Sequence, residues 1–101
     1  MITFRRKKEI EDAILAAHQL VNNVFGYEIE LNGHQREKVV AKTMMIYMLM
    51  DKFTITELAY GMKLHHSTII HYKRRVKDIL TFGKRFEEWD YFEALKKYEV
   101  A

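Results

Sequence analysis

Apolar residues recur three and four positions apart along most of the chain, a spacing typical of amphipathic helices. The first stripe of this kind comprises Ile10, Ala13, Ile14, Ala17, Leu20, Val21 and Val24. Charged residues occupy the opposite face, so the pattern predicts a helix from about Phe4 to Val24 that stops at Gly26. The YEIEL segment at residues 27–31 alternates weakly and, without a partner strand, is predicted to be a connector.

Two further helices are predicted in the middle of the chain. Asn32 is a good N-cap residue, so the first should begin after it and run to about Met50. Its second half contains MMIYMLM and is apolar nearly all round, which predicts a buried central helix. Thr54 is followed three residues later by Glu57, as in a capping box, and this pair predicts a short helix that ends near Lys63.

The last third of the chain contains two periodic segments separated by Gly83. The first starts near His65 or His66, and the second is an amphipathic helix over about residues 84–98. The inner stripe predicted for the first comprises Ile69, Tyr72, Val76, Ile79 and Leu80. With no proline and no internal repeat, these segments predict one all-α domain, residues 1–101, of five or six helices.

Composition excludes several classes of site. The chain has no cysteine, so disulfides and thiolate metal sites are excluded. The run MMIYMLM is far shorter than the roughly 20 apolar residues of a membrane span. The N-terminal FRRKKEIED lacks the apolar block of a signal peptide. We therefore expect a cytoplasmic protein without a membrane partner.

The net charge is only +3, but the basic residues are segregated. Residues 63–85 carry seven Lys or Arg against the single Asp78, and residues 5–8 read RRKK. Such clustering is typical of proteins that bind polyanions, although a solvated helix face gives the same pattern. The segment LHHSTIIHYKRR, residues 64–75, lies in this basic stretch and adds three histidines and two hydroxyls, which makes it the candidate site.

A short helix, a turn of about three residues and a second helix with a basic outer face is the layout of a helix-turn-helix, here over about residues 54–80. The outward residues of the second helix are His66, Ser67, Ile70, His71 and Arg74. Imidazoles and hydroxyls can hydrogen-bond to base edges, isoleucine can contact a thymine methyl group, and arginine suits guanine or phosphate. The flanking basic residues that would meet phosphates are Lys73, Arg75 and Lys77.

Part of the chain resembles the C-terminal DNA-binding domain, domain IV, of the bacterial replication initiator DnaA. The similar segments are AKTMMIYMLM (41–50), ITELAYGM (55–62) and HHSTIIHY (65–72), of which the last is the most specific. The resemblance covers about residues 36–80. It implies a Trp-repressor-like helical fold in which the last segment reads the major groove, with Lys42 at the position of an arginine that enters the minor groove.

The chain departs from this family at defined positions. His65 replaces an acidic residue, Lys42 replaces arginine, and Lys63 stands where the turn usually has glycine. A left-handed backbone at Lys63 would cost roughly 1 kcal/mol or more. No GxxxxGK[ST] phosphate loop occurs, so the sequence predicts a DNA-binding module without an ATPase.

These patterns together define the predicted site. The predicted base contacts are His65, His66, Ser67, Thr68, Ile70 and His71. The residues predicted to contact the DNA backbone are Lys42, Lys63, Lys73, Arg74, Arg75 and Lys77. We expect sequence-specific binding of double-stranded DNA in replication initiation or transcription regulation, by a nucleoid-associated protein of a bacterium, phage or mobile element. A homodimer or a replication or transcription protein is the expected further partner.

Other functions were weighed against this interpretation. His66 and His71 are five residues apart, off the spacing of a helical ligand pair, so no metal is predicted. No triad-like partner appears and a small helical domain leaves little room for a pocket, so we expect no enzyme, no cofactor and no small-molecule substrate. The open alternative is a protein-interaction module, an adaptor or dimerisation domain that has lost DNA binding. Its surface would comprise Trp89, Tyr91, Phe92 and Tyr98, although one stripe of these aromatics is expected to cover the domain's own core.

Overall fold

The computed structural model describes residues 2–100 and the side chains of residues 2–98. Within that range the chain forms five α-helices and one short 3-10 turn, with no strand, which confirms the all-α fold class. The elements are α1 (Phe4–Phe25), α2 (Arg36–Leu49), α3 (Ile55–Met62), α4 (His66–Phe82), η1 (Gly83–Arg85) and α5 (Glu88–Val100). Of these described helices, none combines the length and the apolar character required to cross a membrane.

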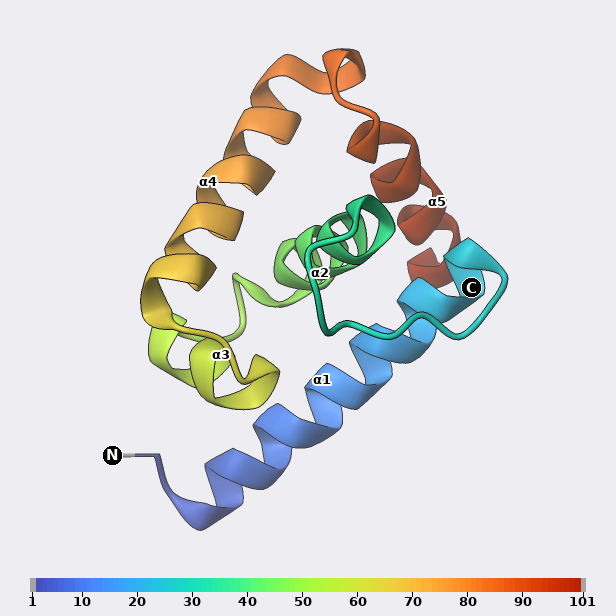
Figure 1. The fold of residues 1–101 in the computed structure, drawn as a ribbon. Coiled ribbons are helices and arrows are strands. Elements are labelled where there is room, and N and C mark those ends of the chain that lie inside the picture. Colours follow the sequence, from blue (N-terminus) through green and yellow to red (C-terminus); the bar gives the residue numbers. More distant parts are fainter. Residues whose placement is uncertain (1, 101) are drawn as a thin grey trace.

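Helix α2 forms the centre of the fold. In Figure 1 the other helices surround it, and it packs against α1, α4 and α5. Residues 40–46 of α2 are all buried, as predicted for the central helix. Tyr47 of α2 stacks on Phe92 of α5 with ring centroids 4.2 Å apart. The middle of α2 therefore lies in the core, and the other helices present their outer faces to solvent.

Local sequence signals set most of the helix ends. Gly26, with a φ of 80°, ends α1 as predicted. Thr54 and Glu57 form the predicted capping box at the start of α3. The Glu57 N–H donates to Thr54 Oγ1 over 3.2 Å, and the Thr54 N–H donates to Glu57 Oε1 over 2.9 Å. Each of these ends follows from residues within one helical turn of it.

The predicted start of α2 is wrong. The helix begins at Arg36 with Gln35 as its N-cap, rather than directly after Asn32. Gly33 explains the difference, because its φ of 113° is a backbone conformation that an α-helix cannot contain. Residues 27–35 therefore form one connector between α1 and α2, and Ile29 of this connector is buried in the core.

Two predictions in the last third of the chain also need correction. Leu80 is 49% exposed rather than part of the inner stripe. It follows the buried Ile79 by one residue, so it points about 100° away from it around the helix axis. The last helix begins at Glu88 rather than near residue 84, because residues 83–85 form η1.

Helices α1 and α3 approach closely at Gly61. A Cβ atom on Gly61 would lie 2.6 Å from Ile10 Cγ2 and 2.9 Å from Ile14 Cγ1. Nonbonded carbon atoms pack at about 3.5–4.0 Å, so no larger residue fits unless the side chains of Ile10 and Ile14 shift. This contact fixes α3 on the core and so positions the turn that leads into α4.

Candidate nucleic-acid interface

A three-residue turn, residues 63–65, joins α3 to α4. Lys63 has φ 57° and ψ 43°, and within the described range it is the one residue other than glycine with a positive φ. The Leu64 N–H donates to the Ala59 carbonyl over 3.1 Å, which closes the end of α3. Helices α3 and α4 are therefore joined by a short turn that holds a lysine in a conformation that favours glycine.

His65 caps the N-terminus of α4. Its Nδ1 accepts hydrogen bonds from the Ser67 N–H, 3.2 Å away, and from the Ser67 hydroxyl, 2.8 Å away. An imidazole that accepts at Nδ1 carries its proton on Nε2, so this network assigns the tautomer of His65. His66 Nε2 lies 3.3 Å from Thr56 Oγ1 of α3. Three of the predicted base contacts, His65, His66 and Ser67, thus also hold the first turn of α4.

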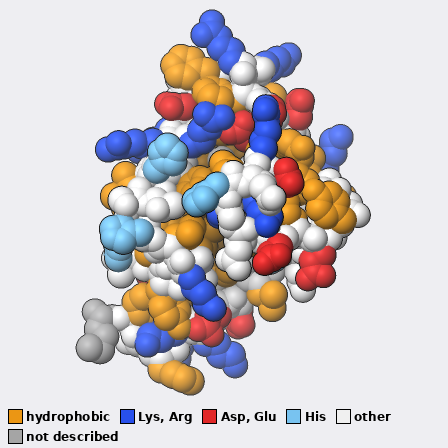
Figure 2. Space-filling view, viewed as in Figure 1, with side chains coloured by type: hydrophobic (Ala, Val, Ile, Leu, Met, Phe, Trp, Pro, Cys, Tyr) orange, Lys and Arg blue, Asp and Glu red, His pale blue; other side chains and the backbone are white. Residues whose placement is uncertain are grey.

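The buried and the exposed residues of α4 lie on different sides of the helix. The core side comprises Ile69, Tyr72, Val76 and Ile79, which are buried. The exposed candidates are His65, His66, Ser67, Ile70, His71, Arg74, Arg75 and Lys77, with Lys63 in the preceding turn. Thr68 and Lys73 are half-buried at the edges of the exposed face. Figure 2 shows histidines gathered over the N-terminal half of α4, with Lys and Arg side chains beside them.

Arg75 takes part in the packing of α4 against α5. Its Nε donates to Glu88 Oε2 over 2.8 Å, and the side chain of Glu88 is buried. The Arg75 guanidinium also lies over the ring of Phe86, 4.7 Å from the ring centroid. The charge of Arg75 is therefore compensated within the protein. Arg74, one residue earlier, has no such role and faces solvent.

Lys42 lies behind α4 rather than on the open surface. The residue is only 5% exposed, and its Nζ donates to the Gly33 carbonyl over 2.8 Å. Burial lowers the pKa of Lys42, and the neighbouring charge of Lys38 lowers this pKa further. Lys42, which is predicted to contact the DNA backbone, thus lines a hollow between α2 and α4. His34 of the connector also lines this hollow. His34 was not predicted to belong to the site, because no pattern along the chain links the connector to α4.

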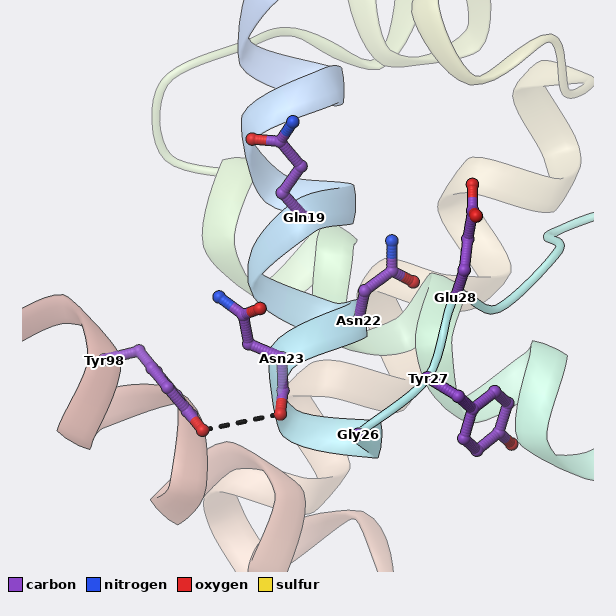
Figure 3. A pocket seen from close by; sticks show the side chains of 7 residues that line it. All are labelled: Gln19, Asn22, Asn23, Gly26, Tyr27, Glu28 and Tyr98. Atoms are coloured by element: carbon purple, nitrogen blue, oxygen red, sulfur yellow. Dashed lines mark hydrogen bonds between the residues drawn. The ribbon is translucent and has the colours of Figure 1, made fainter.

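A second hollow lies between the C-terminal ends of α1 and α5 and is polar (Figure 3). The Tyr98 hydroxyl donates to the Asn23 carbonyl over 3.4 Å, and Asn22 Oδ1 accepts from the Ile29 N–H over 2.9 Å. These polar groups fasten α5 and the connector to α1. None of the predicted DNA contacts lines this hollow.

The described residues contain no group of three or more His, Cys, Asp or Glu side chains arranged to hold a metal ion. Comparison with protein-family models, with curated proteins and with solved structures found no match for this chain. The resemblance to DnaA domain IV therefore rests on its three sequence segments alone.

Proposed function

We propose that this chain binds double-stranded DNA and inserts the exposed face of α4 into the major groove. One observation carries the proposal, and it is the composition of that face. From His66 to Lys77 its exposed side chains are hydroxyl, imidazole, isoleucine or basic, and the single acidic residue of the helix, Asp78, follows directly after them. The opposite face of α4 is locked into the core, so the exposed groups have a fixed direction.

Each exposed group has a counterpart in the major groove. Ser67 and His71 can donate to or accept from base edges, and Ile70, which is 37% exposed, can contact a thymine methyl group. Arg74 suits guanine or a phosphate. Lys63, Lys73 and Lys77 flank the face and would contact phosphates, which position the helix without reading the sequence.

The proposed biological role is replication initiation or transcription regulation. Its support is the similarity of residues 65–72 to the DnaA signature, where the histidines and hydroxyls recur. His65 differs from the family's acidic residue, and its Nδ1 is engaged in the cap of α4. The proposed target sequence is therefore different from that of the family.

A protein-interaction module is the second candidate, and an apolar hollow between α1 and α2 favours it. Its lining residues are Ala13, Ala16, Ala17, Leu20, Tyr47, Met48, Leu49, Asp51, Lys52 and Phe53. In addition, Phe82 at the end of α4 is 53% exposed. Exposed apolar surface of this kind marks docking sites in some proteins. A module of this class would bind a partner protein without binding DNA.

Selection from a random duplex library tests the DNA proposal directly. We expect the wild-type chain to enrich one sequence, and Arg74→Ala to lose affinity for every duplex with a flatter salt dependence. His66→Ala or Ser67→Ala should mainly relax the sequence preference. Lys97→Ala removes one charge from the exposed side of α5 and serves as the matched control.

Two outcomes contradict the proposal. In the first, the library yields no enriched sequence and no duplex binds at moderate salt. In the second, duplexes bind but Lys97→Ala weakens binding as much as Arg74→Ala does, which would indicate nonspecific attraction to the whole surface. The first outcome would favour the interaction module, and detection of a stable homodimer would then support it.

A further inference from the structure

The hollow between the connector and the first two turns of α4, here named the Lys42 hollow, has a volume of about 410 Å³. Its lining residues are His34, Val39, Lys42, Leu64, Ser67, Thr68, His71 and Tyr72. They come from the connector, α2, the turn and α4, so the fold assembles the hollow from four separate segments. None of the eight is acidic.

Two ammonium groups are held at this place by backbone oxygens alone. Lys42 Nζ donates to the Gly33 carbonyl over 2.8 Å, and Lys38 Nζ donates to the Asn32 carbonyl over 2.7 Å. A carbonyl offers a partial charge, whereas buried cations are normally paired with an anion. Among the side chains that the structure describes, no carboxylate forms an ion pair with Lys42. Lys38 does not line the hollow, but its positive charge acts on Lys42 and lowers the pKa of Lys42 further.

The shape of the connector accounts for this arrangement. Gly33 has a φ of 113°, and a Cβ atom added to it would lie 3.6 Å from Lys38 Nζ. The unusual backbone directs two successive carbonyls, those of Asn32 and Gly33, toward α2. The connector thus holds the Lys42 ammonium at the hollow and the Lys38 ammonium in its neighbourhood.

The upper walls of the hollow supply further hydrogen-bond donors. Thr68 contributes a hydroxyl from the first turn of α4, and His71 contributes an imidazole about one turn later, whereas the Ser67 hydroxyl already donates to His65 Nδ1. His34 contributes a second imidazole from the opposite side. The backbone N–H groups of Ser67 and Thr68 are already bonded to His65. Recognition in the hollow would therefore come from side chains rather than from the helix terminus.

We propose that the Lys42 hollow is a phosphate subsite that receives one backbone phosphate of the duplex contacted by α4. Ammonium, hydroxyl and imidazole donors around a cavity match the oxygens of a phosphate group. An anion there would also compensate the charge of Lys42. This inference rests on the proposed function, and it adds a defined contact that fixes the connector and α4 on the same strand.

The first arm of the test uses inorganic phosphate and the free protein. Amide NMR spectra would follow His34, Ser67, Thr68 and His71 during titration with phosphate, against sodium chloride at equal ionic strength. We expect saturable shifts at these residues and a loss of phosphate affinity of about tenfold or more in Lys42→Met, because a charge-assisted hydrogen bond is removed. Lys38→Gln removes the other charge without disturbing the core.

The second arm measures binding of the selected duplex between about 50 and 200 mM salt. Lys42→Met and Lys38→Gln should weaken duplex binding severalfold. Each should also reduce the slope of log affinity against log salt concentration by about one phosphate contact. Lys97→Gln is the control with equal charge loss on α5. If Lys42→Met does not fold, as judged by circular dichroism, His34→Ala, which removes an exposed imidazole from the lining, decides both arms.

The outcomes separate the subsite from the function. Saturable phosphate shifts together with weakened duplex binding support the subsite. If phosphate shifts the amide signals but the variants bind the duplex as tightly as the wild type, the subsite is overturned, since the hollow would then hold free anions only. The subsite is also overturned if phosphate causes no shifts and the variants of the hollow bind the duplex as tightly as the wild type. If Arg74→Ala still loses affinity in that case, DNA binding itself stands. Loss of all duplex binding by the wild type would refute the proposed function itself.

Discussion

Arg6 in the first turn of α1 and Glu57 in the capping box of α3 form a two-point ion pair. Arg6 Nε donates to Glu57 Oε2 over 2.5 Å, and Arg6 Nη2 donates to Glu57 Oε1 over 3.1 Å. The same carboxylate accepts the Thr54 N–H. The guanidinium lies over the ring of Phe53, 4.7 Å from its centroid. Helix α1 is thereby fixed to the start of the helix pair α3–α4, and Arg6 is not free to contact phosphate.

The first prediction concerns the pH dependence of stability. The hydrogen bond from Arg6, followed by that from the Thr54 backbone, lowers the pKa of Glu57 from 4.5 to about 2. The stabilisation from this depressed pKa is fully present above pH 4.5 and is lost as the pH falls toward about 2. Chemical denaturation at several pH values should therefore show a steeper loss in the wild type than in Glu57→Gln.

Glu93→Gln is the control for this experiment. Glu93 pairs with Lys96 within α5, on the exposed surface, over 3.3 Å. Replacing Glu93 should leave the loss of unfolding free energy at low pH almost the same as in the wild type, because exposed ion pairs contribute little to stability. If Glu57→Gln and the wild type lost stability in parallel below pH 4.5, the ion pair would not stabilise the fold.

The sequence was sufficient for features that arise within one helical turn. The spacing of apolar residues located the inner face of α4, and Thr54 with Glu57 marked the start of α3. The same local reasoning failed at Asn32, because its capping preference says nothing about the positive φ of the next residue, Gly33. A good capping residue was present, but the backbone did not begin a helix there.

Features that join distant segments were not predictable in the same way. Arg6 and Glu57 are 51 residues apart, and nothing in their local sequences pairs them. The same holds for the burial of Lys42 and for the approach of His34 to α4, which depend on how the connector folds back. The candidate DNA contacts could thus be named from the sequence, while the positions of Lys42 and Arg75 required the structure.

The second prediction tests the close approach of α1 and α3. Gly61→Ala should destabilise the fold by about 1–3 kcal/mol through overpacking, even though alanine is the better helix former. The clash falls on the side chain of Ile10. In an Ile10→Ala background the same change should therefore cost less, and a double-mutant cycle from denaturation curves measures this coupling. Additive effects would show that Gly61 is not constrained by Ile10.

The third prediction separates stability from binding at Lys63. Lys63→Gly relieves a left-handed lysine and should raise the free energy of unfolding by about 1 kcal/mol. It also removes a positive charge from the turn, so duplex binding should weaken slightly with a smaller salt slope. Lys52→Gly, in a turn with negative φ, is the control and should not stabilise. An unchanged or lowered stability of Lys63→Gly would show that the turn is not strained.

The fourth prediction concerns the N-cap at His65. His65→Ala should destabilise α4 by about 0.5–2 kcal/mol, because the Ser67 N–H loses its acceptor. His65→Asp keeps an acceptor and should fold at least as stably as the wild type, since an acidic side chain also favours a helix N-terminus. The aspartate should nevertheless change the sequence selected from a duplex library. Equal stability of all three proteins would show that the cap contributes nothing.

The last prediction distinguishes Arg74 from Arg75. Arg75→Ala leaves the buried carboxylate of Glu88 without its partner and should destabilise the fold by about 1–3 kcal/mol. Arg74→Ala should leave the thermal midpoint nearly unchanged and weaken duplex binding instead. Replacing Glu88 by Gln in the Arg75→Ala background should recover much of the stability, because the unpaired charge is removed. The hypothesis fails if Arg75→Ala weakens duplex binding as much as Arg74→Ala at full stability, since Arg75 would then contact DNA rather than α5.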